Sequence, residues 1–396
     1  MEKRMRIIMA TALALALLLC AAAADFETLT LGARSESVKE MKQRLGALGY
    51  YSTETFTREF TQNTVEKVRL FQRSNGLPET GAVDAATWEA IFSDAALPPV
   101  KPTMKPVATP APLPRPELPA QDAEGYLSGE GEWFYENDAD GLWMYLSPDL
   151  QITIVRRQDS RLSMEWFETE ILARNGQALE SVMTDPKHLD RNAVKPETLA
   201  KRKKLVLAFS DDFSYNRVTK RETLGVIIRD GQALSKRTNA RTGTHLPNLD
   251  MMAQYPDGSL RVYDCNEISA DDLLELGAVN VFSFGPWLIR DGQINGVLYE
   301  NFRSIEPRHA LGMIAPGHYF VLSVEGRCQA SEGTVLQRMA EIMRSHGVTE
   351  ALNLDGGNTM ALVFHGKMLN QLAVYDGKKF IRTMTTMIGI GHTEAW

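Results

Sequence analysis

A segment near the C-terminus joins a carboxylate to glycines and small polar residues. Residues 351–360 read Ala-Leu-Asn-Leu-Asp-Gly-Gly-Asn-Thr-Met, so a short apolar strand is expected to end just before Asp355. The four residues that follow this carboxylate are Gly356, Gly357, Asn358 and Thr359. Because glycine has no side chain, backbone N–H groups at this strand end can approach an anion closely. We therefore expect an anion-binding backbone beside Asp355.

An ordinary hairpin turn is the alternative for this segment. Asp-Gly pairs favour tight hairpins because glycine accepts a positive φ. Similar pairs stand at 230–231, 257–258, 291–292 and 376–377. In such a turn Asp355 would merely cap the backbone. A second glycine followed by Asn358 and Thr359 is more than a turn requires, and this favours a functional role.

Two arginines and a second carboxylate form another group of candidates. Arg308 and His309 lie within residues 306–312, and Glu325 and Arg327 follow after one further expected strand. Guanidinium groups are planar forks that suit a phosphate, and a strand–turn–strand path would bring both arginines to one end of a sheet. The alternative is that these arginines are simply solvated at the surface.

A third candidate is a pair of carboxylates that follows an apolar run. Residues 207–209 are Leu-Ala-Phe, and Ser210, Asp211 and Asp212 come directly after them. A strand ending in this way could contribute Asp212 to a site. A helix N-cap or a solvated turn explains the same pattern equally well.

Motifs of several other enzyme classes are absent from the sequence. It has no Cys-x-x-Cys, no His-Glu-x-x-His, no Gly-x-Ser-x-Gly and no phosphate loop or dinucleotide fingerprint. The 7 histidines are scattered without metal-binding spacing, so we expect neither a metal nor another cofactor. A net charge of -7 argues against a nucleic-acid partner.

The elements that must position these candidates lie within residues 125–396. Strand-like runs alternate with the Asp-Gly pairs, which predicts hairpins and a largely antiparallel or mixed sheet. Apolar residues at helical spacing predict helices at about 196–203, 269–276 and 333–346. The fold class is therefore α+β or mixed α/β.

A smaller helical domain is expected at residues 26–96. Apolar residues at three- and four-residue spacing predict two helices, and a third short helix follows Asp84, so the domain is a three-helix, all-α bundle. Between Pro98 and Pro119 the chain carries nine of its 18 prolines. Proline at this density favours an extended spacer, and residues 97–120 are therefore read as a linker rather than a loop wrapped over one domain.

Residues 1–24 have the order of a secretory signal peptide. Basic residues precede an apolar run over 7–20, and four alanines follow. The alternative is a retained membrane anchor, although the run is short for a bilayer span. Cleavage would leave a secreted protein with no membrane segment. Cys265 and Cys328 would then remain, either as a disulfide or as two buried thiols.

Residues 26–96 resemble the peptidoglycan-binding domain of the common wall-binding type. The resemblance rests on Leu-Gly-Ala-Leu-Gly-Tyr at 45–50, on Thr64 to Gln72, on Gly-Leu-Pro at 76–78 and on Thr87-Trp88. It implies non-covalent attachment to peptidoglycan or another cell-wall glycan. Most of these apolar positions would also be needed by any three-helix core.

Residues 200–396 resemble the phosphodiester glycosidase family. The shared motifs occur in the family's order: Ile-Arg-Asp-Gly at 228–231, Phe-Gly-Pro at 284–286, Pro-Arg-x-Ala-x-Gly at 307–312, Glu-Gly-Arg at 325–327 and Asn-Leu-Asp-Gly-Gly at 353–357. The resemblance implies hydrolysis of a sugar-1-phosphodiester, such as one of N-acetylglucosamine, to release the sugar. Wall or exopolysaccharide metabolism would be its setting.

The resemblance suggests a role for each candidate. Asp355 would be the leading catalytic carboxylate, as a base or a nucleophile, with Glu325 as its partner. The residues expected to bind the substrate and its phosphate are Arg308, Arg327, Gly356, Gly357, Asn358, Thr359, Asp212 and His309. Whether the sugar is released with retention or inversion depends on the separation of the carboxyl groups, and both outcomes stay open.

Three positions depart from the family pattern. Ser210 replaces an asparagine, Glu325 replaces an aspartate, and Asn358 with Thr359 replaces a Gly-Ser pair. The longer Glu325 keeps a carboxylate but displaces it by one methylene, which catalysis tolerates poorly. A protein that binds wall polysaccharide through a degenerate site is therefore the main alternative, and a structural adaptor at the wall is a second one.

Overall fold

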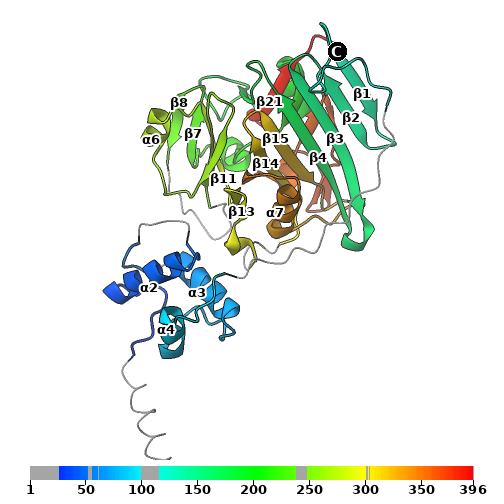
Figure 1. Cartoon of the computed structure of the whole chain (residues 1–396). Coiled ribbons are helices and arrows are strands. Elements are labelled where there is room, and N and C mark those ends of the chain that lie inside the picture. The colour runs from blue at the N-terminus through cyan, green and yellow to red at the C-terminus, as the bar shows by residue number, and fades with distance from the viewer. Residues whose placement is uncertain are drawn as a thin grey trace, which may run out of the picture. The chain divides into compact units, whose positions relative to one another are not determined.

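The structure is a computed structural model that describes residues 26–51, 56–60, 62–99, 116–237, 248–299, 302 and 304–395. The expected signal peptide and most of the expected linker lie outside these ranges. The chain falls into two compact units, which divide between residues 104 and 105. Each unit is described by itself (Figure 1).

The first unit is helical, as the apolar spacing predicts. Its helices are α2 (Glu36–Ala47), α3 (Gln62–Ser74) and α4 (Ala85–Phe92). Ser35 caps α2 by accepting a hydrogen bond from the Val38 N–H, and Asp84 caps α4 in the same way. The buried faces meet in one core that contains Val38, Met41, Leu45, Val68, Phe71 and Ile91. The prediction of a small all-α bundle is confirmed.

Within the described residues, the second unit is built around a nine-stranded sheet (Figure 1). In spatial order its strands are β1 (Trp133–Asn137), β2 (Leu142–Leu146), β3 (Leu150–Asp159), β4 (Met164–Ala173), β15 (His318–Val324), β14 (Arg308–Ala315), β16 (Glu350–Leu354), β12 (Trp287–Arg290) and β13 (Gln293–Ile294).

Three smaller sheets complete the described part of this unit. One contains β10 (Leu260–Tyr263), β9 (Asp250–Gln254), β11 (Asn280–Phe284), β7 (Val226–Arg229) and β8 (Gln232–Lys236). Another contains β18 (Lys367–Met368), β17 (Leu362–Phe364), β6 (Leu205–Phe209), β21 (Thr386–His392) and β5 (Glu180–Met183). The last is the hairpin of β19 (Val374–Tyr375) and β20 (Lys378–Lys379). All strand pairs among the described residues are antiparallel, as is expected for this fold class.

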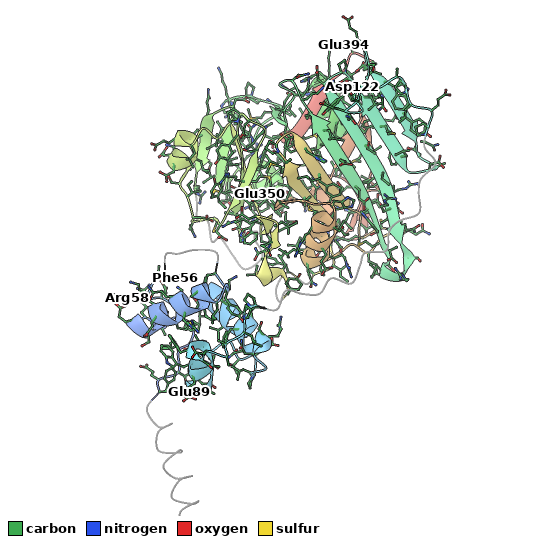
Figure 2. All side chains as sticks on the ribbon, in the orientation of Figure 1. Phe56, Arg58, Glu89, Asp122, Glu350 and Glu394 are labelled. Atoms are coloured by element: carbon green, nitrogen blue, oxygen red, sulfur yellow. The ribbon has the colours of Figure 1, made fainter. Side chains whose placement is uncertain are left out.

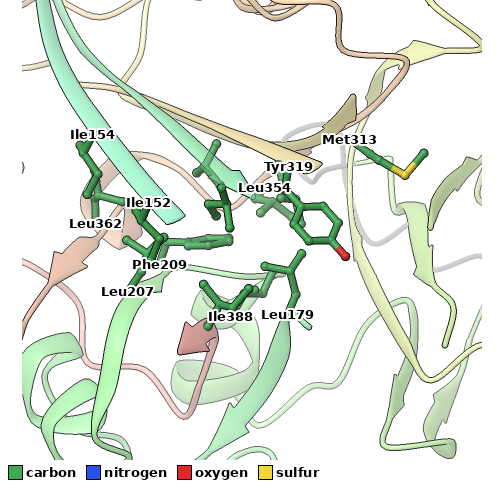
Figure 3. Packing of buried hydrophobic residues seen from close by; sticks show 14 of the residues in the cluster. Ile152, Ile154, Leu179, Leu207, Phe209, Met313, Tyr319, Leu354, Leu362 and Ile388 are labelled. Atoms are coloured by element: carbon green, nitrogen blue, oxygen red, sulfur yellow. The ribbon is translucent and has the colours of Figure 1, made fainter. Parts of the chain in front are cut away.

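The main core lies between the large sheet and the sheet that contains β6. Leu207 and Phe209 of β6 belong to one buried cluster with Ile152 and Ile154 of β3 and Leu354 of β16 (Figure 3). The opposite face of the large sheet is covered by α7 (Leu336–Ser345), whose buried residues join a second cluster with β14 and β15. Both faces at the centre of the large sheet are therefore buried.

The other expected helices are also present. They are α5 (Pro196–Arg202) and α6 (Ala270–Glu275), and with α7 they fall where the apolar spacing predicts. Shorter helical turns are η1 (Ser160–Leu162), η2 (Asn216–Lys220), η3 (Gly296–Tyr299) and η4 (Gly357–Thr359). Among the residues described, no helix is both long and apolar enough to cross a bilayer. No disulfide joins Cys265 to Cys328.

The Asp-Gly pairs divide into turns and one exception. The pairs at 230–231, 257–258, 291–292 and 376–377 each link two adjacent antiparallel strands, and Asp140-Gly141 does the same between β1 and β2. Asp355-Gly356 links no such hairpin, and Gly356 has a φ of -104°. The segment after β16 is therefore not a hairpin turn.

Candidate active site

Three neighbouring strands of the large sheet bring candidate residues to one edge. Arg308 at the start of β14 pairs with the last residue of β15, and His309 pairs with the last residue of β16. Glu325 and Asp355 come directly after those two strand ends. With β14 between them, their backbones lie two strand spacings apart, or about 10 Å. The convergence expected from the sequence is thus present at the level of the backbone.

The smaller sheet contributes a further segment to the same place. Ser210, Asp211 and Asp212 follow β6, and the Asp355 N–H donates to the Asp211 carbonyl oxygen at 3.1 Å. The Ser210 hydroxyl donates to the Asp355 carbonyl oxygen at 3.4 Å. Carboxylates from both layers of the sandwich therefore gather at this end.

The Asp355 carboxyl group is buried and poised near neutrality. The residue is 5% exposed, and burial raises the pKa of its carboxyl to about 7. Arg382 and the Thr359 side chain oppose that shift, as does the Ser214 N–H, which donates to Oδ2 at 3.2 Å. A carboxyl with this pKa can either take or give a proton at neutral pH.

Glu325 is a second buried carboxyl of this kind. It is 1% exposed, and burial raises its pKa to about 7, with nearby Glu165 adding to the shift. Its Oε1 accepts the Gln371 N–H at 2.7 Å, and the Cys328 Sγ lies 3.8 Å from Oε2. Each of the two carboxyl groups thus has its own set of partners.

The glycines after Asp355 serve close packing. A Cβ on Gly356 would lie 2.5 Å from the Pro307 carbonyl oxygen, so no other residue fits there. The Gly357 N–H donates to the same oxygen at 3.0 Å. That N–H is therefore engaged within the protein, which differs from the phosphate contact expected of it. The glycines instead hold the segment after β16 against the start of β14.

The two expected arginines occupy different environments. Arg327 pairs with Glu306, and its Nη1 donates to the Asn358 Oδ1 at 3.4 Å. Arg308 donates to the Ser304 carbonyl and hydroxyl oxygens at 2.9 Å each. Burial and the neighbouring Arg327 lower the pKa of Arg308 to about 10, so its guanidinium stays charged at neutral pH.

Asp212 lies behind the site rather than in it. Its side chain is fully buried, and its two oxygens accept hydrogen bonds from Arg217 and Arg229. Arg217 also donates to the Thr386 hydroxyl at 2.7 Å. Because both oxygens are occupied, the expected contact with substrate is replaced by a structural one.

His309 and Asn358 also differ from their expected roles. His309 is fully buried, and burial lowers its pKa to about 3, so it is neutral and offers a phosphate no charge. Its Nδ1 shares a hydrogen bond with Ser323 at 2.9 Å. Asn358 donates from Nδ2 to the Ala373 and Phe380 carbonyl oxygens at 2.7 and 3.0 Å. Both side chains therefore organise the site from within.

Arg382 is the site residue that sequence reasoning missed. Its Nη1 donates to the Thr359 hydroxyl at 3.0 Å, and its guanidinium lies 4.5 Å from the centroid of the Tyr215 ring. With Arg327 on Asn358, two guanidinium groups thus contact successive residues of η4. No motif surrounds Arg382, and only its position after the 374–379 hairpin could have suggested it.

Several buried polar atoms at this end have no partner among the described residues. They are Asp211 Oδ1, Ser214 Oγ, Asn353 Oδ1 and His309 Nε2. Buried polar atoms normally bond to protein, water or a ligand. Their concentration around Asp355 fits a site that admits water or substrate.

Comparisons with known proteins find two matching families. Residues 203–391 match the sequence model of the phosphodiester glycosidase family, and residues 34–91 match that of the putative peptidoglycan binding domain. The first of these stretches lies within the second unit and the other within the first unit. The stretch similar to the phosphodiester glycosidase family includes Asp355, Glu325 and the arginines around them.

One known protein is similar over a longer stretch of this chain. The SPbeta prophage-derived uncharacterized protein YomE of Bacillus subtilis is 27% identical over 259 residues, which are 61% of this chain and 39% of that protein. The chain therefore spans about two fifths of the length of that relative.

Solved structures with a similar fold come from several organisms. The zebrafish N-acetylglucosamine-1-phosphodiester alpha-N-acetylglucosaminidase catalytic domain is 20% identical, with a TM-score of 0.47, and the match covers 66% of this chain and 88% of that one. A hypothetical protein from Synechocystis is 14% identical, with a TM-score of 0.42 and 62% of each chain covered. An exported protein from Burkholderia pseudomallei is 11% identical, with a TM-score of 0.41, covering 72% of this chain and 100% of that one.

Proposed function

We propose that the protein is a wall-associated hydrolase that cleaves a sugar-1-phosphodiester and releases the sugar. The observation that carries the proposal is the pair of buried carboxyl groups, Asp355 and Glu325, each with its pKa raised to about 7 at the ends of strands that flank β14. The match to the phosphodiester glycosidase family supports the class of bond.

Hydrolysis of this bond adds water between C1 of the sugar and the phosphate oxygen. The hydroxyl goes to C1, and the proton goes to the departing phosphate. Asp355 would take the proton from water or attack C1 itself, and Glu325 would supply the complementary proton transfer. Two carboxyls that are each about half ionised near pH 7 can divide these tasks.

The phosphate would be held by the two arginines that contact η4. Arg327 and Arg382 contact Asn358 and Thr359, so their guanidinium groups flank the segment that follows Asp355. Arg308 is partly buried and lies near Arg327, and its positive charge would support binding of the same phosphate. Fixed positive charge stabilises a phosphate leaving group without a proton.

The first unit would attach the protein to the wall. The match to the putative peptidoglycan binding domain supports non-covalent binding of cell-wall glycan. Together with the signal-like order of residues 1–24, it supports a location outside the cytoplasm. Sedimentation of the full chain with isolated wall, competed by soluble peptidoglycan fragments, tests this part; a chain that stays in the supernatant contradicts it.

Activity is tested by free-sugar release. The full chain is incubated with methyl N-acetylglucosamine-1-phosphate and with nucleotide-linked N-acetylglucosamine, and the free sugar is measured. We expect turnover by the wild type and almost none by Asp355→Asn. Equal release by both proteins would reject the assignment of Asp355.

A non-catalytic binding protein is the second candidate. The departures from the family pattern at Ser210, Glu325 and Asn358-Thr359 favour it, because a displaced carboxyl can leave a site that binds without catalysis. In that case the same substrates would bind to the full chain in calorimetry without any release of sugar.

A further inference from the structure

A short basic hairpin is attached directly to the candidate active site. Strands β19 and β20 are joined by Asp376 and Gly377, which have φ values of 49° and 70° as a tight hairpin requires. The Tyr375 side chain is 55% exposed, and Lys378 and Lys379 are exposed as well. The hairpin therefore presents its side chains to solvent rather than to a core.

Residues of the site hold both ends of this hairpin. The Asn358 amide donates to the carbonyl oxygens of Ala373 and Phe380, which precede and follow the hairpin. The Val374 N–H donates to the Arg327 carbonyl oxygen at 2.9 Å. Since Asn358 comes three positions after Asp355, the hairpin is fixed next to the candidate catalytic carboxyl.

The charge of this region is opposite to that of the chain. Residues 374–382 contain three basic residues and one acidic residue, which are Lys378, Lys379, Arg382 and Asp376. The chain as a whole carries a net charge of -7. The Arg327 guanidinium lies 5.7 Å from the centroid of the Tyr375 ring and is paired with Glu306. A local positive field of this kind attracts an extended anion.

A single sugar-1-phosphodiester does not account for these charges. Such a substrate has one negative charge at the scissile phosphate, and Arg382, which contacts Thr359 of η4, already supplies one positive charge beside Asp355. The exposed Lys378 and Lys379 precede Arg382 in the chain and add two further positive charges. Their charges match further phosphates only if the substrate continues past the bond that is cut.

We propose that the substrate is a polyanionic chain of sugars joined by repeated phosphodiesters, and that the 374–379 hairpin binds the phosphates next to the scissile one. This inference rests on the proposed function and specifies its substrate class. Lys378, which pairs with Tyr375 across the hairpin, contacts the phosphate next to the scissile one, and the exposed face of Tyr375 stacks on the adjoining sugar. Lys379 lies on the other face of the hairpin and adds to the positive field.

The test compares one bond in two settings. Full-length wild type is assayed with a six-repeat oligomer of N-acetylglucosamine-1-phosphate and with its single-linkage methyl ester, at low and at high salt. We expect kcat/KM to be about tenfold higher for the oligomer at low salt and the advantage to shrink at high salt, because exposed charges are screened. The double variant Lys378→Gln/Lys379→Gln should lose most of this preference.

A matched control is available on α5. Lys201→Gln/Arg202→Gln removes two exposed cations from the last turn of α5, just before β6 begins. Asp211 follows the other end of β6, so this variant should keep the preference for the oligomer. Equal kcat/KM for both substrates, with no salt dependence, would overturn the inference and leave the proposed function standing.

Binding decides the inference even without turnover. If neither substrate is hydrolysed, the proposed function fails, and the oligomer is titrated calorimetrically into full-length Asp355→Asn with and without the two lysine substitutions. A loss of about tenfold in affinity on removing the lysines supports the polyanion site. Unchanged affinity, or no binding, contradicts it.

Discussion

The two ends of β16 carry buried carboxyl groups with different surroundings. Glu350 begins the strand, and Asp355 follows its last residue. Burial is the main cause that raises the pKa in both cases. The Glu350 oxygens accept the Val262 and Asp291 N–H groups at 2.9 Å each, which ties the start of β16 to β10 of a smaller sheet and to the turn between β12 and β13. Figure 2 labels Glu350 within the second unit.

Asp355 also accepts backbone N–H groups, those of Ser214 and Tyr215, but it has side-chain neighbours as well. The Thr359 hydroxyl and the Arg382 guanidinium approach it from η4 and the following segment. Unpartnered polar atoms of Asp211 and Ser214 lie on the adjoining segment. The comparison teaches that burial alone does not identify a candidate catalytic carboxyl. The groups that contact the carboxyl oxygens distinguish the two residues.

The largest expected effect separates the two carboxyls by function. Asp355→Asn should lower kcat by about a thousandfold or more, because the group that acts on water or C1 is gone. Glu350→Gln should leave kcat within about twofold and lower the melting temperature, because its amide NH₂ would face an N–H donor. Steady-state kinetics and thermal unfolding of both variants measure this.

Similar losses of kcat in the two variants would remove the distinction between the ends of the strand. So would a Glu350→Gln protein as stable as the wild type.

The next effect concerns stability and pH. The Asp355 carboxyl has a pKa of about 7 in the folded protein, against 3.8 as its ordinary value, so the folded state binds the proton more tightly between these values. Stability from this group is complete below about pH 4 and is lost as pH rises through 7. The loss amounts to roughly 4 kcal/mol for a shift of this size.

Asp355→Asn should therefore be more stable than the wild type at pH 8 and close to it at pH 4, as urea unfolding at the two pH values would measure. If the free energy of unfolding varies with pH in the same way in both proteins, burial does not disfavour the ionised form of the Asp355 carboxyl.

A smaller effect is expected at the second carboxyl of the site. Glu325→Gln should lower kcat about a hundredfold and remove one limb of a pH–rate profile centred near 7, since glutamine does not titrate. Glu325→Asp, which keeps the carboxyl, should retain the limb; an unchanged profile in Glu325→Gln would assign that limb elsewhere.

The smallest effect is expected at Arg382. Arg382→Ala should raise KM or lower kcat/KM about tenfold, because one of two guanidinium groups on η4 is lost. Arg382→Lys should recover only part of this, since lysine lacks the planar fork. The exposed Arg261→Ala serves as the control. Kinetics indistinguishable between Arg382→Ala and this control would leave the phosphate to Arg327 and Arg308.

The elements of the fold follow largely from local sequence. Helices α2, α5, α6 and α7 lie where apolar spacing places them, because one buried face is written at every third or fourth residue. The hairpins form at Asp-Gly pairs for an equally local reason. The extra glycine that follows the Asp355-Gly356 pair distinguished that pair from the others, and this residue, Gly357, has a φ of 57°, which glycine adopts without strain.

The roles around the site depend on distant partners and were harder to predict. Asp212 is held by Arg217 and Arg229, which belong to other segments of the chain, and no spacing in the sequence announces that network. His309 carries a neutral ring because it is fully buried, with the Phe209 ring of β6 at 5.5 Å between the two ring centroids. Arg382 contacts Thr359 because the chain turns back toward η4 after the 374–379 hairpin, and no sequence pattern predicts this path.

The single amide of Asn358 closes residues 374–379 into a loop whose anchor points belong to the scaffold. What lies between the anchors can be exchanged, lengthened or recharged without moving Asp355. Under the proposed function, changes confined to these six residues would alter the choice of polymer and leave the candidate catalytic residues Asp355 and Glu325 in place.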